Sequence, residues 1–219
     1  MKKKNYKRLV ISCDGGAASG KTTGARLIAN KYKLKFLSSG MLYRYASYLI
    51  IKKKPKNKIS LLKKEFKKIN LNKLNQLDLN NQTISEHTSK IAKIKKIRDI
   101  LKSFQVLFSK KNKKCIIEGR DISTEILPSS DVKFFFTCDL TNASKRRFQD
   151  LKKGKHEVKL LDVKRSIKLR NIRDKNRKHS PLLKHRDALE IHTGKLNKKK
   201  MIDKMSKHIE KVMNKRYVS

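Results

Sequence analysis

The feature that most constrains this chain is a glycine-rich stretch at residues 15–22, which reads Gly-Gly-Ala-Ala-Ser-Gly-Lys-Thr. It fits G-x-x-x-x-G-K-[ST], in which glycines let the backbone approach a polyphosphate and successive N–H groups point toward it. The apolar run at residues 8–14 predicts a buried strand before it, and apolar residues at helical spacing up to Tyr32 predict a helix after it. This context supports a phosphate-binding loop. The alternative interpretation is a Gly/Ser-rich turn that caps an ordinary helix.

Within the loop, two side chains have specific chemical tasks. Lys21 is expected to reach the β- and γ-phosphates of a nucleoside triphosphate, and the Thr22 hydroxyl is expected to hold the accompanying Mg²⁺. The start of the following helix adds the positive end of its dipole. The expected triphosphate-binding residues of the loop are Gly15, Gly16, Ala17, Ala18, Ser19, Gly20, Lys21, Thr22 and Thr23.

Length and cysteine usage restrict the class of protein. A chain of 219 residues buries a substantial core and suggests one domain or one domain with an insertion. Cys13, Cys115 and Cys138 lie far apart in apolar runs, which predicts reduced thiols, and no C-x-x-C spacing suggests a metal site built by the protein alone. No apolar run reaches about 18 residues, and the basic N-terminus leads into a strand, so a cytoplasmic protein without membrane association is expected.

The charge balance is unusual, with 59 Lys and Arg against 18 Asp and Glu and a formal net charge of +41. Such a charge suits nucleic-acid binding. The lysines are spread over nearly every segment, however, and form no single basic stripe with interleaved aromatic residues. The charge therefore predicts solubility and attraction to polyanions without a specific nucleic-acid partner, and we expect a monomer.

Periodicity along the chain predicts an α/β fold. Short apolar runs predict strands at residues 8–14, 33–39, 114–118, 132–137 and 188–192. Amphipathic spacing predicts helices at residues 40–50, 86–110, 142–152, 162–178 and 201–213. Alternating strands and helices indicate a five-stranded, mainly parallel sheet flanked by helices. Ligands of such sheets bind beyond the carboxyl ends of the strands, so the loops after Asp14, Ser38, Glu118 and Thr137 should meet at one edge.

Two segments interrupt this alternation. Residues 52–85 are rich in Lys, Asn, Leu and Ile and predict a small insertion outside the sheet, with Leu62 and Phe66 at helical spacing and a hairpin centred on Asn81 and the residue before it. Residues 153–157 are polar, which predicts a mobile segment between two helices.

A second group of charged residues is expected at the same edge. Arg120 and Asp121 directly follow the strand at residues 114–118, and Arg170, Asp174 and Arg177 fall at i, i+4 and i+7 of a predicted helix. The planar guanidinium groups suit phosphate oxygens. The alternative interpretation of the helical group is a solvated face with internal salt bridges.

Taken together, these blocks resemble the bacterial cytidylate kinases, which are nucleoside monophosphate kinases of the P-loop class. The resemblance spans nearly the whole chain in family order, and the G-R-D-I and R-x-x-x-P-L blocks are more specific than the glycine loop. The matching residues are Asp14-Gly15, Gly20-Lys21-Thr22-Thr23, Ser39-Gly40-x-x-Tyr43-Arg44, Ser89-x-x-Ala92, Ile97-Arg98, Glu118-Gly119-Arg120-Asp121-Ile122-x-Thr124, Arg146-Arg147, Arg170-x-x-x-Asp174-x-x-Arg177-x-x-x-Pro181-Leu182 and Asp187-Ala188.

The resemblance implies transfer of the γ-phosphoryl group of ATP to CMP or dCMP, giving CDP or dCDP. It assigns the residues expected at the acceptor as follows: Ser89, Arg98 and Asp121 at the cytosine, Arg170 and Asp174 at the ribose, and Ser39, Tyr43, Arg44, Arg120 and Arg177 around the phosphate. It places Arg146 and Arg147 over ATP, and it gives stabilisation of the transferring charge to Lys21, Arg120, Arg170 and Arg177. A carboxylate accepts from the exocyclic amine of cytosine, while Arg and Ser donate to the ring acceptors.

The same resemblance implies a single P-loop kinase domain over residues 1–219. Residues 52–88 form a reduced insertion that binds the nucleoside monophosphate, and residues from about 148 to 164 form a lid. The chain departs from the family pattern at five positions, which bear on strict preference for CMP rather than on phosphoryl transfer: Gly16 for Pro, Ala18 for Gly, Ser38 for Asp, Ser123 for Gly and His192 for Asp.

Two alternatives stay open from the sequence. The first alternative is that the acceptor is another nucleoside monophosphate, such as UMP or AMP, although Ser89, Arg98 and Asp121 suit a cytosine edge. A more distant alternative is a basic, RNA-associated P-loop protein in which phosphate binding serves regulation; it leaves the spaced Arg and Asp residues of the C-terminal half unexplained.

Overall fold

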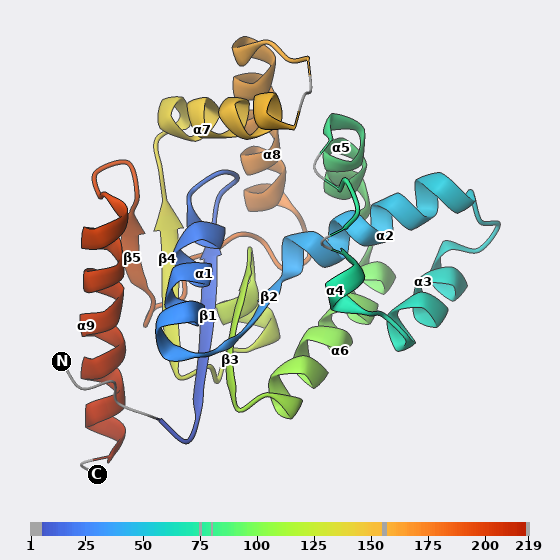
Figure 1. The fold of residues 1–219 in the computed structure, drawn as a ribbon. Helices are drawn as coiled ribbons and strands as arrows, with labels where there is room; N and C mark the ends of the chain where they lie inside the picture. The colour runs from blue at the N-terminus through green and yellow to red at the C-terminus, as the bar shows by residue number, and fades with distance from the viewer. Residues whose placement is uncertain (1–5, 75, 80, 155–156, 218–219) are drawn as a thin grey trace.

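The predicted strands form one parallel sheet at the centre of the molecule (Figure 1). The computed structural model describes residues 6–74, 76–79, 81–154 and 157–217. The strands are β1 (Leu9–Gly15), β2 (Lys35–Ser38), β3 (Lys114–Gly119), β4 (Val132–Thr137) and β5 (Leu189–His192). Their order is β2-β3-β1-β4-β5, and each neighbouring pair is parallel. The predicted α/β class and five-stranded sheet are confirmed.

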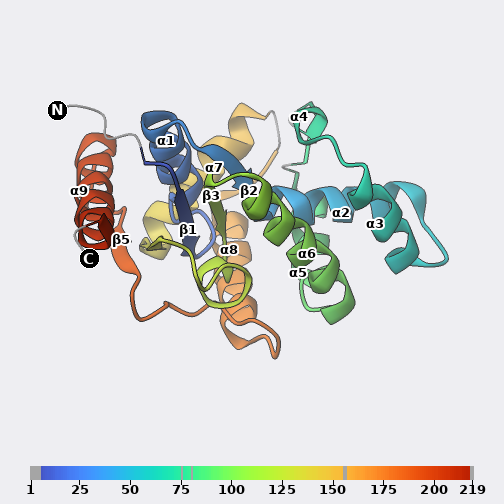
Figure 2. The same cartoon turned by 90° about the horizontal axis from the view of Figure 1, so that it is seen from below.

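Helices cover both faces of the sheet, as the views in Figures 1 and 2 show. On one face, α1 (Lys21–Tyr32) and α9 (Lys198–Tyr217) pack against Leu9, Ile11 and the other residues of β1 that point that way. On the other face, α2 (Ser39–Lys53), α6 (Lys95–Lys111) and the π-helix η1 (Ile122–Ile126) pack around Val10 and Ile117. Because side chains alternate along a strand, apolar residues at successive positions supply both layers of core.

Two groups of helices extend beyond the sheet. Helices α7 (Leu140–Lys153) and α8 (Leu160–Asn176) lie above the carboxyl ends of the strands and share a small apolar cluster with Ala17 of the glycine loop. Helices α3 (Lys58–Lys67), α4 (Leu71–Leu74) and α5 (Gln82–Ile91) extend sideways from α2. Two residues of the predicted lid, 155 and 156, and residue 80 of the predicted hairpin lie outside the described residues.

The single helix predicted for residues 86–110 is wrong, because the chain forms α5 and α6 with a break between them. Helix α5 ends at Ile91, where the Thr88 hydroxyl bonds to Ser47 of α2 in a buried contact of 2.9 Å. Helix α6 starts at Lys95 and packs mainly along α3, with fewer contacts to α2, β3 and η1. Two different packing partners therefore divide a sequence whose apolar spacing is continuous, and Ile94, expected on the inner face, is 41% exposed.

The predicted hairpin centred on Asn81 is also wrong. The Asn81 side chain caps α5, where its Oδ1 accepts a hydrogen bond from the backbone N–H of Ile84 at 2.9 Å. An Asn before a polar turn suits both a hairpin and a helix start, and the packing of α5 against α2 decides between them. Among the described helices, none is long and apolar enough to span a membrane.

The cap of α5 is testable by Asn81→Ala. Loss of the side-chain acceptor should lower the free energy of unfolding by about 1 kcal/mol, measured by urea denaturation. Asn57→Ala, which removes the corresponding cap of α3, should cost a similar amount, since Asn57 accepts from the N–H groups of Ile59 and Ser60. Asn176→Ala, at an exposed helix end, is the control. An unchanged midpoint for Asn81→Ala would contradict the assigned cap.

Candidate active site

The glycine loop connects β1 to α1 and is held from two sides. The Ala17 N–H donates to Asn171 Oδ1 of α8 at 2.8 Å, and the Thr193 hydroxyl, after β5, donates to the Ser19 carbonyl at 2.9 Å. Glycine is needed at position 15 because a Cβ there would lie 2.4 Å from the Phe136 carbonyl oxygen. Sequence reasoning missed Asn171 and Thr193, since neither belongs to a local motif and both reach the loop through the tertiary fold.

Ala18 adopts a left-handed backbone conformation with φ of 53°. This region costs an alanine about 1–2 kcal/mol because its Cβ approaches the following carbonyl oxygen. The replacement of the usual Gly at this position therefore introduces strain in the loop. Gly16, which replaces a Pro, is also close-packed, since a Cβ there would lie 3.2 Å from Asn171 Oδ1.

Lys21 begins α1, and its ammonium group is buried in the site. Its Nζ donates to the Gly16 carbonyl at 3.0 Å. Burial and the nearby Arg120 guanidinium lower the pKa of Lys21 to about 7, while Glu118 acts in the opposite direction. A buried ammonium next to a guanidinium gains from an anion placed between them. The environment of Lys21 thus favours a phosphate-bearing ligand.

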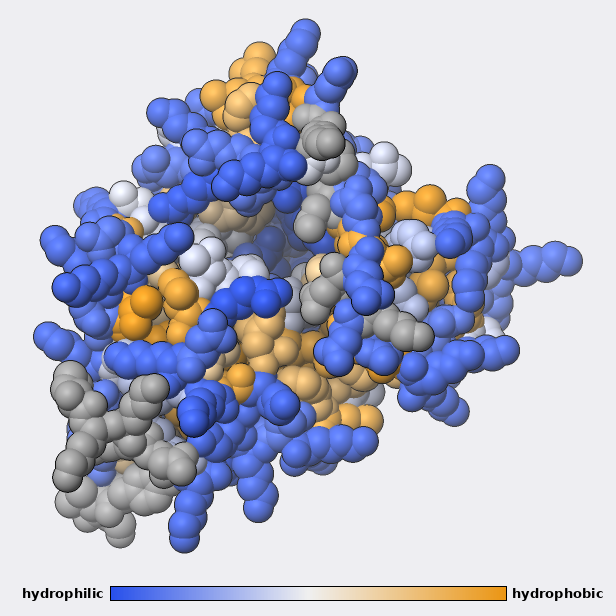
Figure 3. All heavy atoms as spheres, in the orientation of Figure 1, coloured by the Kyte–Doolittle hydropathy of each residue, from blue (hydrophilic) through white to orange (hydrophobic). Residues whose placement is uncertain are grey.

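Between the glycine loop, α2, α5, α7 and α8 lies a cleft with a volume of about 400 Å³. Figure 3 shows the hollow below α7 with hydrophilic side chains around it. Its lining has three carboxylates, from Glu86, Glu118 and Asp150. Against these stand seven basic residues: Lys21, Arg26, Arg44, Arg120, Arg147, Arg170 and Arg173. The cleft is therefore electropositive, which suits a polyanionic ligand.

The guanidinium groups in the cleft repel one another. Burial, followed by Arg170 and Arg147, lowers the pKa of Arg44 to about 9. Burial and the neighbouring Arg120 lower the pKa of Arg170 to about 10. These groups keep their charge at neutral pH, and their mutual repulsion is relieved when an anion binds among them.

One hydroxyl on α5 contacts two of these arginines. Ser85 Oγ accepts from Arg44 Nη1 at 2.9 Å and lies 3.4 Å from Arg147 Nη2, while Ser85 itself donates to the Asn81 carbonyl. Arg44 also donates to the Leu79 carbonyl at 2.8 Å. Ser85 therefore brings an arginine of α2 and an arginine of α7 to the same point, and no sequence motif marked it.

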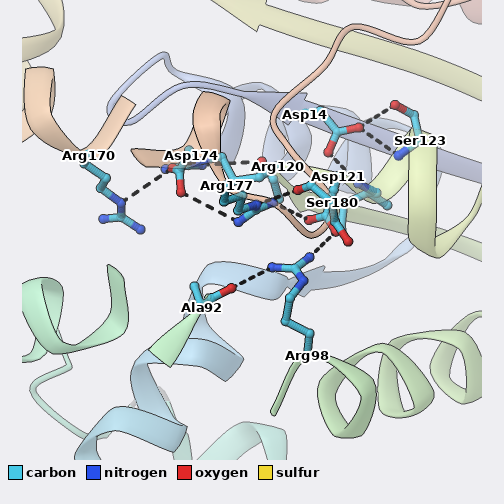
Figure 4. A network of polar contacts seen from close by, with 12 residues as sticks. Asp14, Ala92, Arg98, Arg120, Asp121, Ser123, Arg170, Asp174, Arg177 and Ser180 are labelled. Atoms are coloured by element: carbon cyan, nitrogen blue, oxygen red, sulfur yellow. Dashed lines mark hydrogen bonds and ion pairs between the residues drawn. The ribbon is translucent and has the colours of Figure 1, made fainter. Parts of the chain in front are cut away.

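The Asp174 carboxylate of α8 lies close to three of the predicted arginines, two of which also line the cleft (Figure 4). Its carboxylate lies 2.8 Å from Arg120 Nε, 3.7 Å from Arg177 Nη1 and 4.0 Å from Arg170 Nε. Burial acts to raise the pKa of Asp174, but Arg120 and Arg170 hold it below its ordinary value. The structure thus joins residues 120, 170, 174 and 177 as the sequence predicted.

The geometry of Arg177 corrects one expectation. Helix α8 ends at Asn176, and Arg177 has extended backbone angles, so it is not the third member of a helical face. Its side chain nevertheless turns back, because its Nε donates to the Ser180 carbonyl at 2.5 Å and its Nη2 lies 3.3 Å from Asp121. A tertiary ion pair, rather than helical spacing, places this guanidinium.

Asp121 forms the second ion-pair centre. It pairs with Arg98 of α6 as well as with Arg177, and all three side chains are almost fully buried. Arg98 and Asp121 line a second cavity of about 370 Å³, together with Tyr43. Ser89, predicted to share the base with them, lines the first cleft. The three residues predicted at the base therefore line two different cavities rather than one pocket.

Other predicted residues take clear positions. Thr22 and Thr23 line the cleft from the first turn of α1, whereas Ser39 is buried beside Gly119. Arg146 is engaged at the end of β5, where its guanidinium donates to the Thr193 hydroxyl at 2.8 Å and to the Thr193 carbonyl at 2.9 Å.

Ser38, which replaces an Asp, has two partners that sequence reasoning missed. Its hydroxyl donates to Glu118 and accepts from the Met41 N–H at 3.2 Å, so it also caps α2. The strand predicted at residues 33–39 includes Ser38, so a cap by this residue was not expected. An Asp at this position would face Glu118 with a like charge.

Among its described residues, the cleft offers a bound cation a threonine hydroxyl rather than a cluster of protein ligands. In the described part of the chain, no three His, Cys, Asp or Glu side chains come together as metal ligands. The exposed Thr22 hydroxyl in the cleft fits a single protein ligand to Mg²⁺, and the remaining ligands must then come from phosphates and water.

The parallel sheet, the glycine loop and the buried lysine define this protein as a P-loop kinase. The profile of the cytidylate kinase family matches residues 11–211. A cytidylate kinase of Fusobacterium nucleatum is 35% identical over 215 residues, covering 93% of this chain and 98% of the relative. One of Rickettsia conorii is 37% identical over 205 residues, covering 91% of each chain. The chain belongs to the cytidylate kinase family.

A solved structure agrees on the fold alone. An uncharacterized protein from Eubacterium ventriosum has a TM-score of 0.51 and 17% sequence identity, covering 94% of this chain and 99% of that one. At this identity the likeness extends to the arrangement of strands and helices and not to the site.

The strain at Ala18 is testable by Ala18→Gly. Glycine adopts a positive φ without the Cβ contact, so the free energy of unfolding should rise by about 1 kcal/mol after the entropic cost of glycine is subtracted. The matched control is Ala17→Gly, which should lower it, since Ala17 is buried and has no positive φ. Loss of stability in Ala18→Gly would contradict the assigned strain.

The low pKa of Lys21 predicts a pH dependence of stability in the absence of ligands. The unfolded chain keeps the lysine proton up to about pH 10.5, whereas the folded protein loses it near pH 7. The unfolded state thus binds more protons between these values, and stability rises with pH in this window by up to about 1.4 kcal/mol per pH unit. Denaturant unfolding at pH 7 and pH 9 should show this rise in the native protein and not in Lys21→Met. Lys35→Met, at an exposed position, is the control. Parallel pH profiles of stability for the native protein and Lys21→Met would refute the predicted contribution of Lys21.

Proposed function

We propose that this protein is a cytidylate kinase that transfers the γ-phosphoryl group of ATP to CMP or dCMP, giving ADP and CDP or dCDP. The observation that carries the proposal is the cleft between the glycine loop and the arginines held by Asp174, in a chain of this family. The cleft has a donor side, at the glycine loop, and an acceptor side, at the arginine and aspartate network.

On the donor side, we assign the triphosphate to the N–H groups of the glycine loop and to Lys21. The buried position of the Lys21 ammonium, close to Glu118 and Arg120, supports this assignment. Thr22 would hold the Mg²⁺ that accompanies ATP and neutralises part of the phosphate charge. Arg147, which lines the cleft from α7, is placed over the phosphates, while Arg146 lies at the end of β5 on the same side.

On the acceptor side, the assignments follow the charges. Tyr43, Arg44, Arg120 and Arg177, with Ser39, are assigned to the CMP phosphate, and Arg170 with Asp174 to the ribose. Asp121 is assigned to the exocyclic amine of cytosine, with Arg98 and Ser89 at the ring acceptors. Because Ser89 lines one cavity and Arg98 the other, a base that contacts both must reach from one cavity to the other.

The chemistry asks little of any single residue. Phosphoryl transfer depends mostly on alignment of the two substrates and on stabilisation of charge on the transferring group. Lys21, Arg120, Arg170 and Arg177 are the groups we assign to this stabilisation. Each is buried or half-buried, so its electrostatic effect on the phosphates is greater than at an exposed position.

Within this single domain, an acceptor-binding insertion and a lid are proposed. Residues 52–88 form the insertion that binds the acceptor, supported by Gln82, Ser85 and Glu86 in the cleft lining. Residues from about 148 to 164 form the lid, supported by Asp150, Leu151 and Val163 on the opposite side. Closure of the lid excludes water that otherwise hydrolyses ATP.

The substrate is tested by ADP release from MgATP with CMP, dCMP, UMP and AMP as separate acceptors. CMP and dCMP should stimulate release most strongly, because cytosine presents an amine for Asp121, a ring nitrogen acceptor and a carbonyl oxygen along one edge, whereas uracil lacks the amine and adenine lacks the carbonyl oxygen. ADP formation that no monophosphate changes would refute kinase activity, and preference for UMP or AMP would refute the assigned acceptor. Lys21→Ala should fold and lose nearly all transfer, by at least about 100-fold.

A further inference from the structure

Asp14 is a buried carboxylate that the proposed reaction does not use. It precedes the glycine loop at the end of β1, and its side chain crosses to the segment that follows β3 (Figure 4). Asp14 Oδ1 accepts from the Ile122 N–H at 2.7 Å, and Oδ2 accepts from the Ser123 N–H at 2.8 Å and from the Ser123 hydroxyl at 2.5 Å. All three residues are fully buried.

These contacts replace a local cap. Residues 122 and 123 are the first two of η1, whose start leaves N–H groups that need an acceptor. Asp121 occupies the N-cap position, where an aspartate side chain usually accepts from the first turn. In this structure the Asp121 side chain makes no cap hydrogen bond, and Asp14 supplies the acceptor oxygens instead.

Because Asp121 does not cap η1, its carboxylate is available for ion pairs. With the first turn of η1 satisfied by Asp14, both Asp121 oxygens face guanidinium groups, one toward Arg98 and one toward Arg177. A carboxylate that caps its own helix cannot hold this orientation. The direction of the Asp121 side chain therefore depends on a residue of the neighbouring strand.

We propose that Asp14 and Ser123 are positioning residues for the acceptor base, because they cap η1 in place of Asp121 and so keep the Asp121 carboxylate directed at Arg98 and Arg177. The inference rests on the proposed function, in which Asp121 accepts from the exocyclic amine of cytosine. It gives a role to Ser123, where the family pattern has Gly: the hydroxyl adds a third hydrogen bond to the Asp14 carboxylate.

Ser123→Ala is the principal test, since it removes one hydroxyl and keeps the backbone N–H. A hydrogen bond from a buried hydroxyl to a carboxylate is lost, so Asp121 competes with the weakened Asp14 cap. The KM for CMP should rise about tenfold, while the KM for ATP should change less than about twofold. Discrimination between CMP and UMP, measured as the ratio of their kcat/KM values, should fall by a similar factor, because uracil lacks the amine.

A second variant and a matched control separate positioning from simple loss of stability. Asp14→Asn keeps the side-chain shape but turns one acceptor into a donor, and it should act in the same direction more strongly. Ser130→Ala removes another buried serine hydroxyl, 2.9 Å from Ser12 Oγ in the middle of β1, and should leave both KM values unchanged.

The structural readout is hydrogen exchange at the Arg98 guanidinium, followed by NMR of the full-length protein labelled with ¹⁵N-arginine. Exchange should accelerate about tenfold in Ser123→Ala as the ion pair with Asp121 weakens, and remain slow in Ser130→Ala. Folded Ser123→Ala protein with unchanged Arg98 exchange, unchanged KM for CMP and an unchanged CMP/UMP ratio overturns the inference. If the native protein does not phosphorylate CMP, the proposed function fails instead, and the Arg98 exchange alone still decides whether Ser123 positions Asp121.

Discussion

Buried positive charge is costly unless an anion lies beside it, and the active-site cleft of this protein is arranged around that constraint. Asp174 and Asp121 each hold two or more guanidinium groups at the carboxyl edge of the sheet. Burial, and after it repulsion from neighbouring guanidinium groups, lowers the pKa values of Lys21, Arg44 and Arg170. A ligand with several phosphates relieves that repulsion. The pattern of charge therefore favours polyanionic ligands, whichever base they carry.

The burial of positive charge also distinguishes the cleft from the rest of the protein surface. The chain carries a formal charge of +41, and Figure 3 shows hydrophilic side chains over most of the visible face. Exposed lysines are hydrated and screened by salt, so they contribute little to specificity. The arginines of the cleft differ because they are at least partly buried and fixed by named partners, such as Asp174 for Arg120 and Ser85 for Arg44.

Sequence reasoning predicted the sheet well because each strand is a short apolar run bounded by polar residues, a local property. It failed where two packings suit the same pattern. Residues 86–110 have continuous helical spacing, but Thr88 binds α2 while α6 packs on α3, so the helix divides. Asn81 suits a turn and a cap equally, and the contact between α5 and α2 selects the cap. Helical spacing also placed Arg177 on α8, whereas an ion pair to Asp121 positions it outside the helix.

The sequence by itself determined the phosphate-binding loop, the order of the motifs and the family, because these depend on residue types at fixed spacing. Only the tertiary structure decided which side chains support that loop and the segment that carries Asp121. Asn171 and Thr193 reach the loop from 154 and 174 residues away, and Asp14 caps a helix that begins 108 residues later. Such contacts depend on which strands become neighbours in the sheet. The spacing of residues along the chain does not show which distant side chains will form a hydrogen bond.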